Sequence, residues 1–386
     1  MTRLAIVTTH PIQYYAPVFK MLSQKPGLEV RVFYTWGEGS LKKYDPGFGK
    51  EIEWDIPLLE GYNYTFLKNT APDAGSHHFK GIINPDATSV IDKFAPDALL
   101  IYGWAYKSHL RLLRHFHRKI PVYFRGDSNL ADETPGIKSL LRGAFLKWLY
   151  RHIDYAFYVG TANKAYYLKA GLKKDQLLFA PHAIDNNRFS ENKGSEAEWL
   201  RRCLHIKQDD VLILFAGKLE EKKAPCLLLS AFKKLNNKKV HLLFTGNGPM
   251  EALLKEKART LNNIHFMDFQ NQKKLPAVYQ ACDLFCLPSR GPGETWGLAV
   301  NEAMASGKAV LVSDKVGCTT DLVKEGVNGY IFKSGIEDDL LKRLEILVSE
   351  KEKLSAMGKR SFKIIQDWCF EKQVNTIASA INKKQK

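Results

Sequence analysis

The chain contains no apolar run that approaches the length of a membrane span. Crossing a bilayer takes about 20 consecutive apolar residues, and charged residues interrupt the apolar segments of this 386-residue chain before that length is reached. The opening stretch, "MTRLAIVTTHPIQYY", has an apolar core too short for a secretory signal and lacks a small-residue cleavage site. We therefore expect a cytoplasmic protein, either free in solution or peripheral at the inner face of the membrane.

Cysteine is scarce, and its spacing argues against a structural zinc site. The chain has six cysteines, and none forms a C-x-x-C pair. Several lie in apolar runs such as "APCLLLSAF" and "ACDLFCLPS", where a cysteine is usually a buried, reduced thiol. This usage is typical of a reducing cytosol.

Acidic residues are outnumbered by basic ones, so we expect an anionic partner. There are 57 Lys and Arg against 41 Asp and Glu, which gives a net charge of +16. Nucleotides, nucleic acids and acidic lipids all fit such a surface, and composition does not choose among them. The apolar content of 45% and charged content of 25% are ordinary for a soluble globular protein.

Short β-branched or aromatic runs alternate with longer amphipathic stretches, which is the pattern of βαβ units around a parallel sheet. We expect strands in the first half at residues 3–10, 28–36, 97–104, 120–127, 154–161 and 176–185. A polar stretch at residues 185–199 is predicted as a linker. Further strands are expected at residues 211–219, 239–249, 263–269, 283–289, 309–314 and 329–332.

The repeat of this pattern predicts an α/β protein with two doubly wound, Rossmann-like domains facing each other across a cleft. A chain of 386 residues is long enough for two cores. We place the first domain at residues 1–188 and the second at 189–366, with a helix at about 367–386 that packs back on the first. Ligands in such sheets bind at the carboxyl ends of the strands.

One stretch combines a glycine-rich turn, a helix start and two carboxylates. Residues 288–314, "PSRGPGETWGLAVNEAMASGKAVLVSD", predict a strand end followed by a helix from about Gly297 to Gly307. The N–H groups of the first helical turn favour an anion. If residues 294–302 were helical throughout, Glu294 and Glu302 would lie ~12 Å apart, with room for a diphosphate between two hydroxylated rings. The alternative is that both glutamates are solvated surface residues.

Six motifs in this order resemble one known family. Besides residues 288–314, they are "PHAIDNNRF" at 181–189, "AGKLEEKKAP" at 216–225, "FTGNGP" at 244–249, the stretch that precedes residue 288, and "VGCTTDLVKEGVNGYIF" at 316–332. Together they resemble the family-4-type retaining glycosyltransferases of the GT-B fold, whose signature is E-x7-E. The resemblance covers the whole second domain.

The resemblance implies a catalytic role for three residues. Glu294 would hold hydroxyls of the transferred sugar, while Lys218 and Lys223 would neutralise the departing diphosphate, a role that electrostatics supports independently. Lys218 stands where the family more often has arginine, which keeps the charge but loses the bidentate fork. The alternative for both lysines is solvated charge in a loop.

The resemblance also implies a donor site. Backbone N–H groups near Gly297 and Leu298 would cradle the diphosphate, Glu302 would bind the ribose hydroxyls, and Phe269 would lie beside the base. The chain has no Asp-x-Asp pair, the usual carboxylate clamp for a metal-bound diphosphate, so we expect no metal and no cofactor. The expected donor-binding residues are Gly217, Phe269, Thr295, Trp296, Gly297, Leu298 and Glu302.

Two glycines near this site have a simpler interpretation. In "GNGP", Gly246 and Gly248 need only permit a tight turn from strand to helix.

The first domain departs from the family pattern, so its assignments rest on position alone. Family members commonly have a glycine-rich loop after the first strand, whereas this chain has "THPIQYYAP". We assign His10, Gln13, Arg125 and Asp127 to the acceptor side, with Asp127 as a group that orients or deprotonates an acceptor hydroxyl. The alternatives are that Asp127 caps a turn and that His10 is a local turn partner.

A basic amphipathic segment suggests an anionic membrane surface as a further partner. In "IKSLLRGAFLKWLYRH", residues 137–152, the apolar face includes Leu141, Phe145 and Trp148, and basic residues flank it. Such a helix suits the interface of an anionic bilayer. The alternative is a helix packed on the sheet with solvated basic edges.

The predicted function is transfer of a hexose-type sugar from a nucleotide-diphosphate sugar to a glycan or lipid-linked glycan. The resemblance implies retention of configuration and a place in cell-surface polysaccharide or glycoconjugate synthesis. A nucleotide-sugar epimerase on the same fold is one alternative. A basic nucleic-acid-binding protein is another, but no interleaving of basic residues with stacking aromatics supports it, so we expect no nucleic-acid partner.

Overall fold

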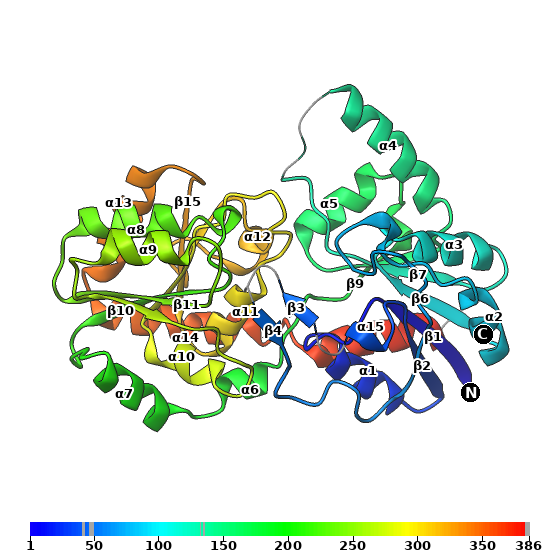
Figure 1. Ribbon diagram of the computed structural model, residues 1–386, viewed down its shortest axis with the longest axis horizontal. Coiled ribbons are helices and arrows are strands. Elements are labelled where there is room, and N and C mark those ends of the chain that lie inside the picture. The colour runs from blue at the N-terminus through cyan, green and yellow to red at the C-terminus, as the bar shows by residue number, and fades with distance from the viewer. Residues whose placement is uncertain (41–42, 46–49, 132, 134–135, 383–386) are drawn as a thin grey trace. The chain divides into compact units, whose positions relative to one another are not determined.

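The computed structural model describes residues 1–40, 43–45, 50–131, 133 and 136–382 (Figure 1). The chain forms two compact units. The first consists of Met1–Lys43, Ile56–His182 and Phe370–Lys386, and the second consists of Tyr44–Asp55 and Ala183–Cys369. The predicted boundary between residues 188 and 189 falls a few residues later, inside a helix.

The first unit is built on a seven-stranded parallel sheet with the order β5-β2-β1-β6-β7-β8-β9. Strand β1 lies at the centre of the register, where Ile6 is aligned with Val32 on one side and Leu100 on the other. The strands are β1 (Thr2–Thr8), β2 (Leu28–Tyr34), β5 (Asn63–Phe66), β6 (Ala98–Tyr102), β7 (Val122–Arg125), β8 (Tyr155–Tyr158) and β9 (Leu177–Phe179).

Helices cover both faces of this sheet, because its strands are apolar on both sides. One face carries a core that includes Ile91, Leu113 and Leu149 from three helices, and Tyr123 donates a hydrogen bond from its hydroxyl to the backbone oxygen of Ala380 (3.0 Å) on the other. The helices are α1 (Ala16–Ser23), α2 (Ala87–Phe94), α3 (Lys107–Phe116), α4 (Ile137–Tyr150), α5 (Thr161–Lys169) and α15 (Phe370–Asn382), with short 3-10 turns η1 (Glu38–Ser40), η2 (Phe79–Gly81) and η3 (Lys174–Gln176).

The second unit has a six-stranded parallel sheet with the order β12-β11-β10-β13-β14-β15. Its strands are β10 (Val211–Ala216), β11 (Val240–Thr245), β12 (Ile264–Met267), β13 (Leu284–Leu287), β14 (Ala309–Ser313) and β15 (Gly329–Phe332). A two-stranded sheet of β3 (Lys43–Asp45) and β4 (Lys50–Ile52) is separate. The predicted fold class, two Rossmann-like α/β domains with parallel sheets, is confirmed.

The helices of the second unit again flank the sheet on two sides. Leu228, Leu254 and Leu344 belong to one core with the strands, and Phe189 contacts Tyr279 at a ring-centre distance of 5.7 Å elsewhere in the unit. The elements are α6 (Asn186–Ser190), α7 (Gly194–Cys203), η4 (Glu221–Lys223), α8 (Pro225–Leu235), α9 (Glu251–Ala258), α10 (Leu275–Ala281), α11 (Leu298–Ala305), α12 (Thr319–Leu322), α13 (Glu337–Val348) and α14 (Lys351–Ile365).

The predicted linker at residues 185–199 is wrong, because most of it is helical. Asp185 caps α6 by accepting a hydrogen bond from the backbone N–H of Arg188 (3.1 Å). The buried residues Phe189, Ala197 and Leu200 hold α6 and α7 in the second unit. These apolar positions are widely spaced among polar ones, so the segment resembles a loop in sequence.

The described residues contain no helix that is both long enough and apolar enough to cross a membrane.

Two histidines are buried in the first unit in their neutral form. His109 is fully buried, with Nδ1 2.9 Å from the backbone oxygen of Gly103 and Nε2 2.8 Å from the hydroxyl of Thr35. Burial lowers its pKa to about 4. Burial, with a smaller contribution from the charge of Arg125, lowers the pKa of His182 to about 3.

We predict that the first unit loses stability as the pH falls from about 6.5 towards 4. In this pH range the histidines are protonated in the unfolded chain but stay neutral in the folded protein, so the free energy of unfolding decreases with decreasing pH. For His109 alone, a pKa of about 4 corresponds to roughly 2 kcal/mol between pH 7 and pH 5. Urea unfolding at both pH values should show a smaller pH dependence for His109→Gln than for the wild type. If the wild type and His109→Gln showed the same pH dependence, the lowered pKa of His109 would be contradicted.

Candidate active site

Most of the predicted site residues lie along one edge of the second sheet. Strands β12, β11, β10 and β13 are neighbours and run parallel, so the segments that follow them meet at their carboxyl ends. This edge is where open α/β sheets bind their ligands. It is formed by residues 217–223, 246–250, 268–274 and 288–297.

Close backbone packing explains the glycines that follow β10 and β11. A Cβ atom on Gly246 would lie 2.1 Å from the backbone oxygen of Gly217, and one on Gly248 would lie 2.6 Å from that of Leu219. No side chain fits at those distances. Gly246 and Gly248 therefore permit the tight turn after β11, which is the simpler interpretation given above. They also let two loops of the site pack directly on each other.

Lys223 and Glu294 form an ion pair at the centre of this edge. The Lys223 ammonium contacts Oε2 of Glu294, and the hydroxyl of Ser289 donates a hydrogen bond to the same oxygen (2.9 Å). The two charged side chains are only 18% and 9% exposed. Their attraction is weakly screened there, so the solvated alternative for these two residues is wrong.

The backbone brings this pair together from distant parts of the chain. The N–H of Arg290 donates to the backbone oxygen of Lys222 (2.8 Å), which fastens the loop after β13 to the turn η4. Ala224 ends η4 in the left-handed conformation (φ 49°) and turns the chain into α8. Lys222 itself pairs with Glu220 (3.2 Å) and is 43% exposed.

Lys218 lies in the same loop, directly after Gly217. It is half-buried, and Gly217 adopts a positive φ of 152°. A cation in this position lies on the edge where Lys223 and Glu294 meet.

The start of α11 requires a glycine. Gly297 has φ of 93° in the left-handed region, and a Cβ there would lie 2.6 Å from Cγ1 of Val316. The predicted helix start is confirmed, since α11 begins at Leu298. Residues 294–296 are not helical, so the spacing computed for a continuous helix from Glu294 to Glu302 does not apply.

Glu302 is buried in α11, so its alternative as a surface residue is also wrong. It is 3% exposed, and the hydroxyl of Tyr279 donates a hydrogen bond to its Oε2 (2.8 Å). Tyr279 is fully buried in α10. Sequence reasoning missed Tyr279, because an apolar helix offers no sign that one tyrosine points its hydroxyl at a carboxylate of the next helix.

The neighbours of Glu294 differ in their exposure. The side chain of Trp296 is 3% exposed, donates to Oδ1 of Asn301 (2.9 Å) and packs against Trp368. It is therefore a core residue, and only its backbone borders the turn. Thr295 and Leu298 are half-buried.

An aromatic pair lies at the end of β12. Phe269 contacts Trp54 edge-to-face at a ring-centre distance of 6.1 Å, and its N–H donates to Oδ1 of Asn247 (3.0 Å). Trp54 belongs to the segment Tyr44–Asp55, which is part of the second unit although the residues on either side of it belong to the first. The side-chain amide of Asn271 holds this segment by donating to the backbone oxygen of Glu53 (2.7 Å). Sequence reasoning missed Trp54, because it lies far from the second-unit motifs in the chain.

In the first unit, the structure assigns Arg125 to packing. Arg125 is 2% exposed, and its guanidinium donates to the backbone oxygens of Ala180 (2.7 Å) and Pro181 (3.0 Å). It therefore holds the chain after β9 against β7.

His10 and Gln13 follow β1 at the carboxyl edge of the first sheet. His10 is half-buried, with its Nδ1 2.9 Å from the hydroxyl of Thr9, and it meets Trp36 edge-to-face at 5.1 Å. The contact with Thr9 fits the alternative of a local partner, and the contact with Trp36 links His10 to the end of β2. Gln13 is buried, with 8% of its surface exposed.

Asp127 lies after β7 in a loop that its neighbours hold in place. The hydroxyl of Tyr167 donates to the backbone oxygen of Gly126 (2.9 Å), and Asn163 donates to that of Ser128 (2.7 Å). Burial and then the charge of Asp127 raise the pKa of Tyr15 well above its ordinary value. The carboxylate of Asp127 is thus close enough to Tyr15 to influence it.

A pocket of about 670 Å³ opens at the ends of β2 and β5 in the first unit. Trp36, Glu38, Lys68 and Asn69 are among the residues that line it. Since His10 contacts Trp36, the pocket lies next to a predicted acceptor-side residue.

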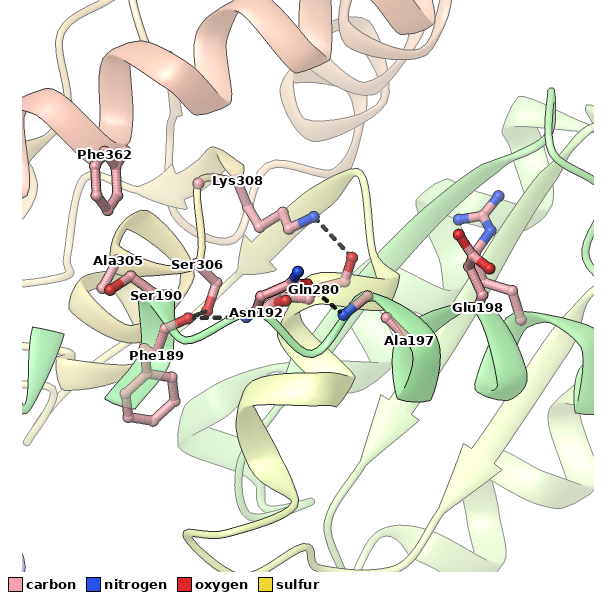
Figure 2. A pocket seen from close by; sticks show the side chains of 13 residues that line it. Phe189, Ser190, Asn192, Ala197, Glu198, Gln280, Ala305, Ser306, Lys308 and Phe362 are labelled. Atoms are coloured by element: carbon pink, nitrogen blue, oxygen red, sulfur yellow. Dashed lines mark hydrogen bonds between the residues drawn. The ribbon is translucent and has the colours of Figure 1, made fainter. Parts of the chain in front are cut away.

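A second pocket, of about 520 Å³, lies at the opposite edge of the second sheet (Figure 2). The ammonium of Lys308 donates to the backbone oxygen of Gln280 (2.8 Å). The amide of Gln280 donates to the backbone oxygen of Phe189 (3.1 Å), and its Oε1 accepts from the N–H of Lys193 (2.9 Å). These polar groups are occupied by the fold itself, so we assign no ligand to this pocket.

Part of the chain is similar in sequence to known proteins. Residues 198–364 match the family profile described as "Glycosyl transferases group 1". Sulfoquinovosyl transferase SQD2 of Arabidopsis thaliana is 25% identical over 291 residues, which cover 72% of this chain and 54% of that protein. Lipopolysaccharide 1,2-N-acetylglucosaminetransferase of Salmonella typhimurium is 26% identical over 220 residues, which cover 53% of this chain and 57% of that protein. The chain thus spans about half the length of these relatives.

Solved structures show the fold. The crystal structure of Anabaena HepE in complex with UDP and glucose superimposes with a TM-score of 0.73 at 17% identity, covering 99% of this chain and 100% of that one. At this identity the likeness shows the GT-B fold alone. The group 1 match in the second unit and the GT-B fold of the whole chain together support a glycosyltransferase.

Proposed function

We propose that this chain transfers a hexose-type sugar, with retention, from a nucleotide-diphosphate sugar to a glycan or lipid-linked glycan in cell-surface polysaccharide or glycoconjugate synthesis. The observation that carries the proposal is the buried Lys223–Glu294 pair beside the start of α11. The relatives favour neither an epimerase nor a nucleic-acid-binding protein.

The chemistry rests on stabilising the leaving group. When the bond from the sugar to the diphosphate breaks, its electron pair stays on the diphosphate oxygen. The ammonium groups of Lys218 and Lys223 and the N–H groups at the start of α11 offset that charge. These lysines supply the counter-charge without a metal on the diphosphate, consistent with the absence of an Asp-x-Asp pair.

Glu294 positions the sugar and also prepares Lys223. Its carboxylate accepts hydroxyl hydrogen bonds of the sugar, and its charge keeps the Lys223 ammonium at the place where the diphosphate leaves. Ser289 fixes the carboxylate by donating to Oε2 (2.9 Å). We infer that the acceptor attacks the face from which the diphosphate departs, which accounts for retention without a protein nucleophile.

Glu302 holds the ribose end of the donor. Tyr279 occupies its Oε2 (2.8 Å), which fixes the orientation of the carboxylate towards the ribose hydroxyls. Phe269, which follows β12, and its neighbour Trp54 offer an aromatic surface to the base. Because HepE was crystallised with UDP, uridine is the first base to test.

The acceptor is held by the first unit. The pocket lined by Trp36 offers an aromatic surface and polar groups, the combination that sugar rings require. His10 and Asp127 lie at the same carboxyl edge of that sheet and serve as candidate groups for orienting the acceptor hydroxyl.

The exposed face of α4 brings the enzyme to a lipid-linked acceptor. Ile137, Leu140 and Leu141 are 78%, 75% and 67% exposed, whereas Leu146, Leu149 and Tyr150 of the same helix are buried in the core of the unit. The helix thus packs on the sheet through its second half, as the alternative has it, and its first half leaves apolar side chains exposed. Exposed basic side chains surround them, at Lys138, Arg142, Lys147 and Arg151. An apolar strip with a basic rim fits the interface of an anionic bilayer.

We predict that one nucleoside diphosphate stabilises the protein through Glu302. In a thermal-shift panel of UDP, GDP, ADP and their glucose conjugates, a ligand at 100 times its Kd adds about 2.7 kcal/mol to the free energy of unfolding. Glu302→Gln should lose most of this shift, whereas Glu256→Gln, an exposed glutamate of the same unit, should keep it. Absence of stabilisation by every nucleotide would refute the proposed function.

We predict that Lys223→Ala slows donor cleavage about 100-fold or more, because it removes one preorganised charge from the leaving group. The readout is the release of nucleoside diphosphate from the donor that stabilises the protein most, with and without acceptor. Lys222→Ala is the matched control, since its side chain is 43% exposed and pairs with Glu220 rather than with Glu294. If both variants lose activity equally, Lys223 has no special role.

We predict that replacing Ile137, Leu140 and Leu141 with serine releases the protein from anionic vesicles. Cosedimentation with phosphatidylglycerol-rich vesicles should fall to the level seen with neutral phosphatidylcholine vesicles. Leu253→Ser, which changes an exposed leucine on α9, should leave binding intact. Equally weak binding of the wild type to anionic and neutral vesicles would refute the membrane proposal.

A further inference from the structure

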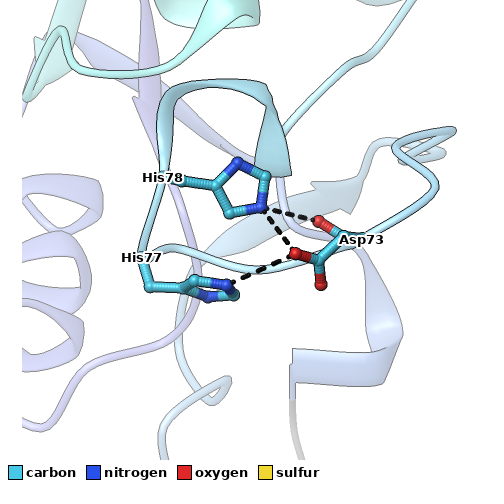
Figure 3. A group of neighbouring side chains, drawn as sticks. All are labelled: Asp73, His77 and His78. Atoms are coloured by element: carbon cyan, nitrogen blue, oxygen red, sulfur yellow. Dashed lines mark hydrogen bonds and ion pairs between the residues drawn. The ribbon is translucent and has the colours of Figure 1, made fainter.

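Three potential metal ligands converge on a short loop of the first unit (Figure 3). Nε2 of His78 lies 3.1 Å from Oδ2 of Asp73, and Nε2 of His77 lies 3.6 Å from the same oxygen. One ligand atom from each residue lies within 4.8 Å of the others. Figure 3 shows both imidazoles turned towards the carboxylate.

We propose that Asp73, His77 and His78 bind a divalent transition-metal ion of the Zn²⁺ class. Two imidazoles and one carboxylate are borderline ligands, which favour zinc and its first-row neighbours over Mg²⁺ and Ca²⁺. Three protein ligands leave further positions for water or for an anion. The proposal goes beyond the transferase function, and its metal is separate from the diphosphate, whose predicted ligands belong to the second unit.

The distances in this cluster are close to those of a tetrahedral site. Bonds of about 2.0–2.1 Å from zinc to nitrogen or oxygen place neighbouring ligand atoms roughly 3.3 Å apart. The separations of 3.1 Å and 3.6 Å from Oδ2 to the two Nε2 atoms lie on either side of that value. The third separation, between the two imidazole nitrogens, is within 4.8 Å, so an ion would draw the two rings together and replace the contacts that they now make with Asp73.

The loop is held in shape independently of the cluster. The N–H of Gly75 donates to the backbone oxygen of Gly81 (3.0 Å), and the Asn69 amide donates to the same oxygen (2.9 Å). The hydroxyl of Tyr106 donates to the backbone oxygen of Ser76 (3.0 Å). Ligands carried by a fixed backbone lose less entropy when they bind an ion.

Gly75 leaves the space that the His77 ring occupies. A Cβ on Gly75 would lie 2.5 Å from Nδ1 and Cε1 of His77. A side chain at residue 75 would therefore displace the His77 ring from its present position.

The cluster borders the pocket that we assign to the acceptor. Ala74, between the first two ligands, lines that pocket together with Asn69, which also braces the loop. A bound ion would lock this wall of the pocket, and its open positions could take an anionic group of an acceptor. This consequence rests on the proposed function, whereas ion binding itself does not.

Isothermal titration of ZnCl₂ into the tag-free, metal-free full-length protein tests the site without any nucleotide sugar. We expect one ion per chain from this site, with binding at least ten-fold weaker in His77→Ala, His78→Ala and Asp73→Asn. Gly75→Ala should also weaken it. X-ray absorption of the zinc-loaded protein should show two imidazole ligands.

The matched control is His115→Ala. His115 forms a comparable exposed pair with Asp92 (3.0 Å), but this pair is not part of any group of three possible ligands among the described residues. His115→Ala should bind zinc like the wild type. Equal zinc affinity in the wild type, His77→Ala and His78→Ala would overturn the proposal, as would absence of binding, and either outcome would leave the transferase proposal standing.

Discussion

The ion pair between Lys223 and Glu294 is the interaction around which the second unit's site is arranged. Both side chains are nearly buried, and a buried charge is costly unless a partner and hydrogen bonds compensate it. Ser289 supplies such a hydrogen bond, and the backbone contact between Arg290 and Lys222 joins the two loops that carry the pair. The same arrangement leaves a cation, a carboxylate and a helix start on one edge of a sheet, which suits a substrate with both hydroxyl groups and a diphosphate.

The two units use the carboxyl ends of their strands in different ways. In the second unit, charged and aromatic side chains gather there from the segments that follow β10, β12 and β13, while the segment after β11 supplies two closely packed glycines. In the first unit, the guanidinium of Arg125 donates to backbone carbonyl oxygens. The pocket of this unit lies instead beside Trp36. A sheet edge that binds a common donor needs few variations, whereas one that binds an acceptor changes with each acceptor. Under the proposed function, the second unit binds the donor and the first binds the acceptor, and this difference would account for the weaker family resemblance of the first unit.

The sequence predicted the fold class, the start of α11 near Gly297 and the strands of the two large sheets except β5 (Asn63–Phe66), because these depend on local periodicity and on glycine chemistry. It did not predict that residues 185–199 are helical, since their few apolar positions are hidden among polar ones. It also missed Tyr279, Trp54 and Ser289, whose roles come from contacts across many residues of chain. The interpretation that Glu294 binds hydroxyls of the sugar and Glu302 those of the ribose remains a proposal. Their burial excludes the alternative that both are solvated surface residues.

The sequence by itself therefore determined most strands of the two large sheets and where glycine is needed, because backbone conformation and apolar periodicity are local properties. Only the tertiary structure decided which of several similar charges matter. Lys222 and Lys223 are adjacent in one lysine-rich run, yet one lies in solvent and the other meets a buried carboxylate. Asp73, His77 and His78 look like ordinary loop residues until the turn brings them together. Burial and convergence of side chains depend on the packing of distant segments, and a local pattern does not contain that information.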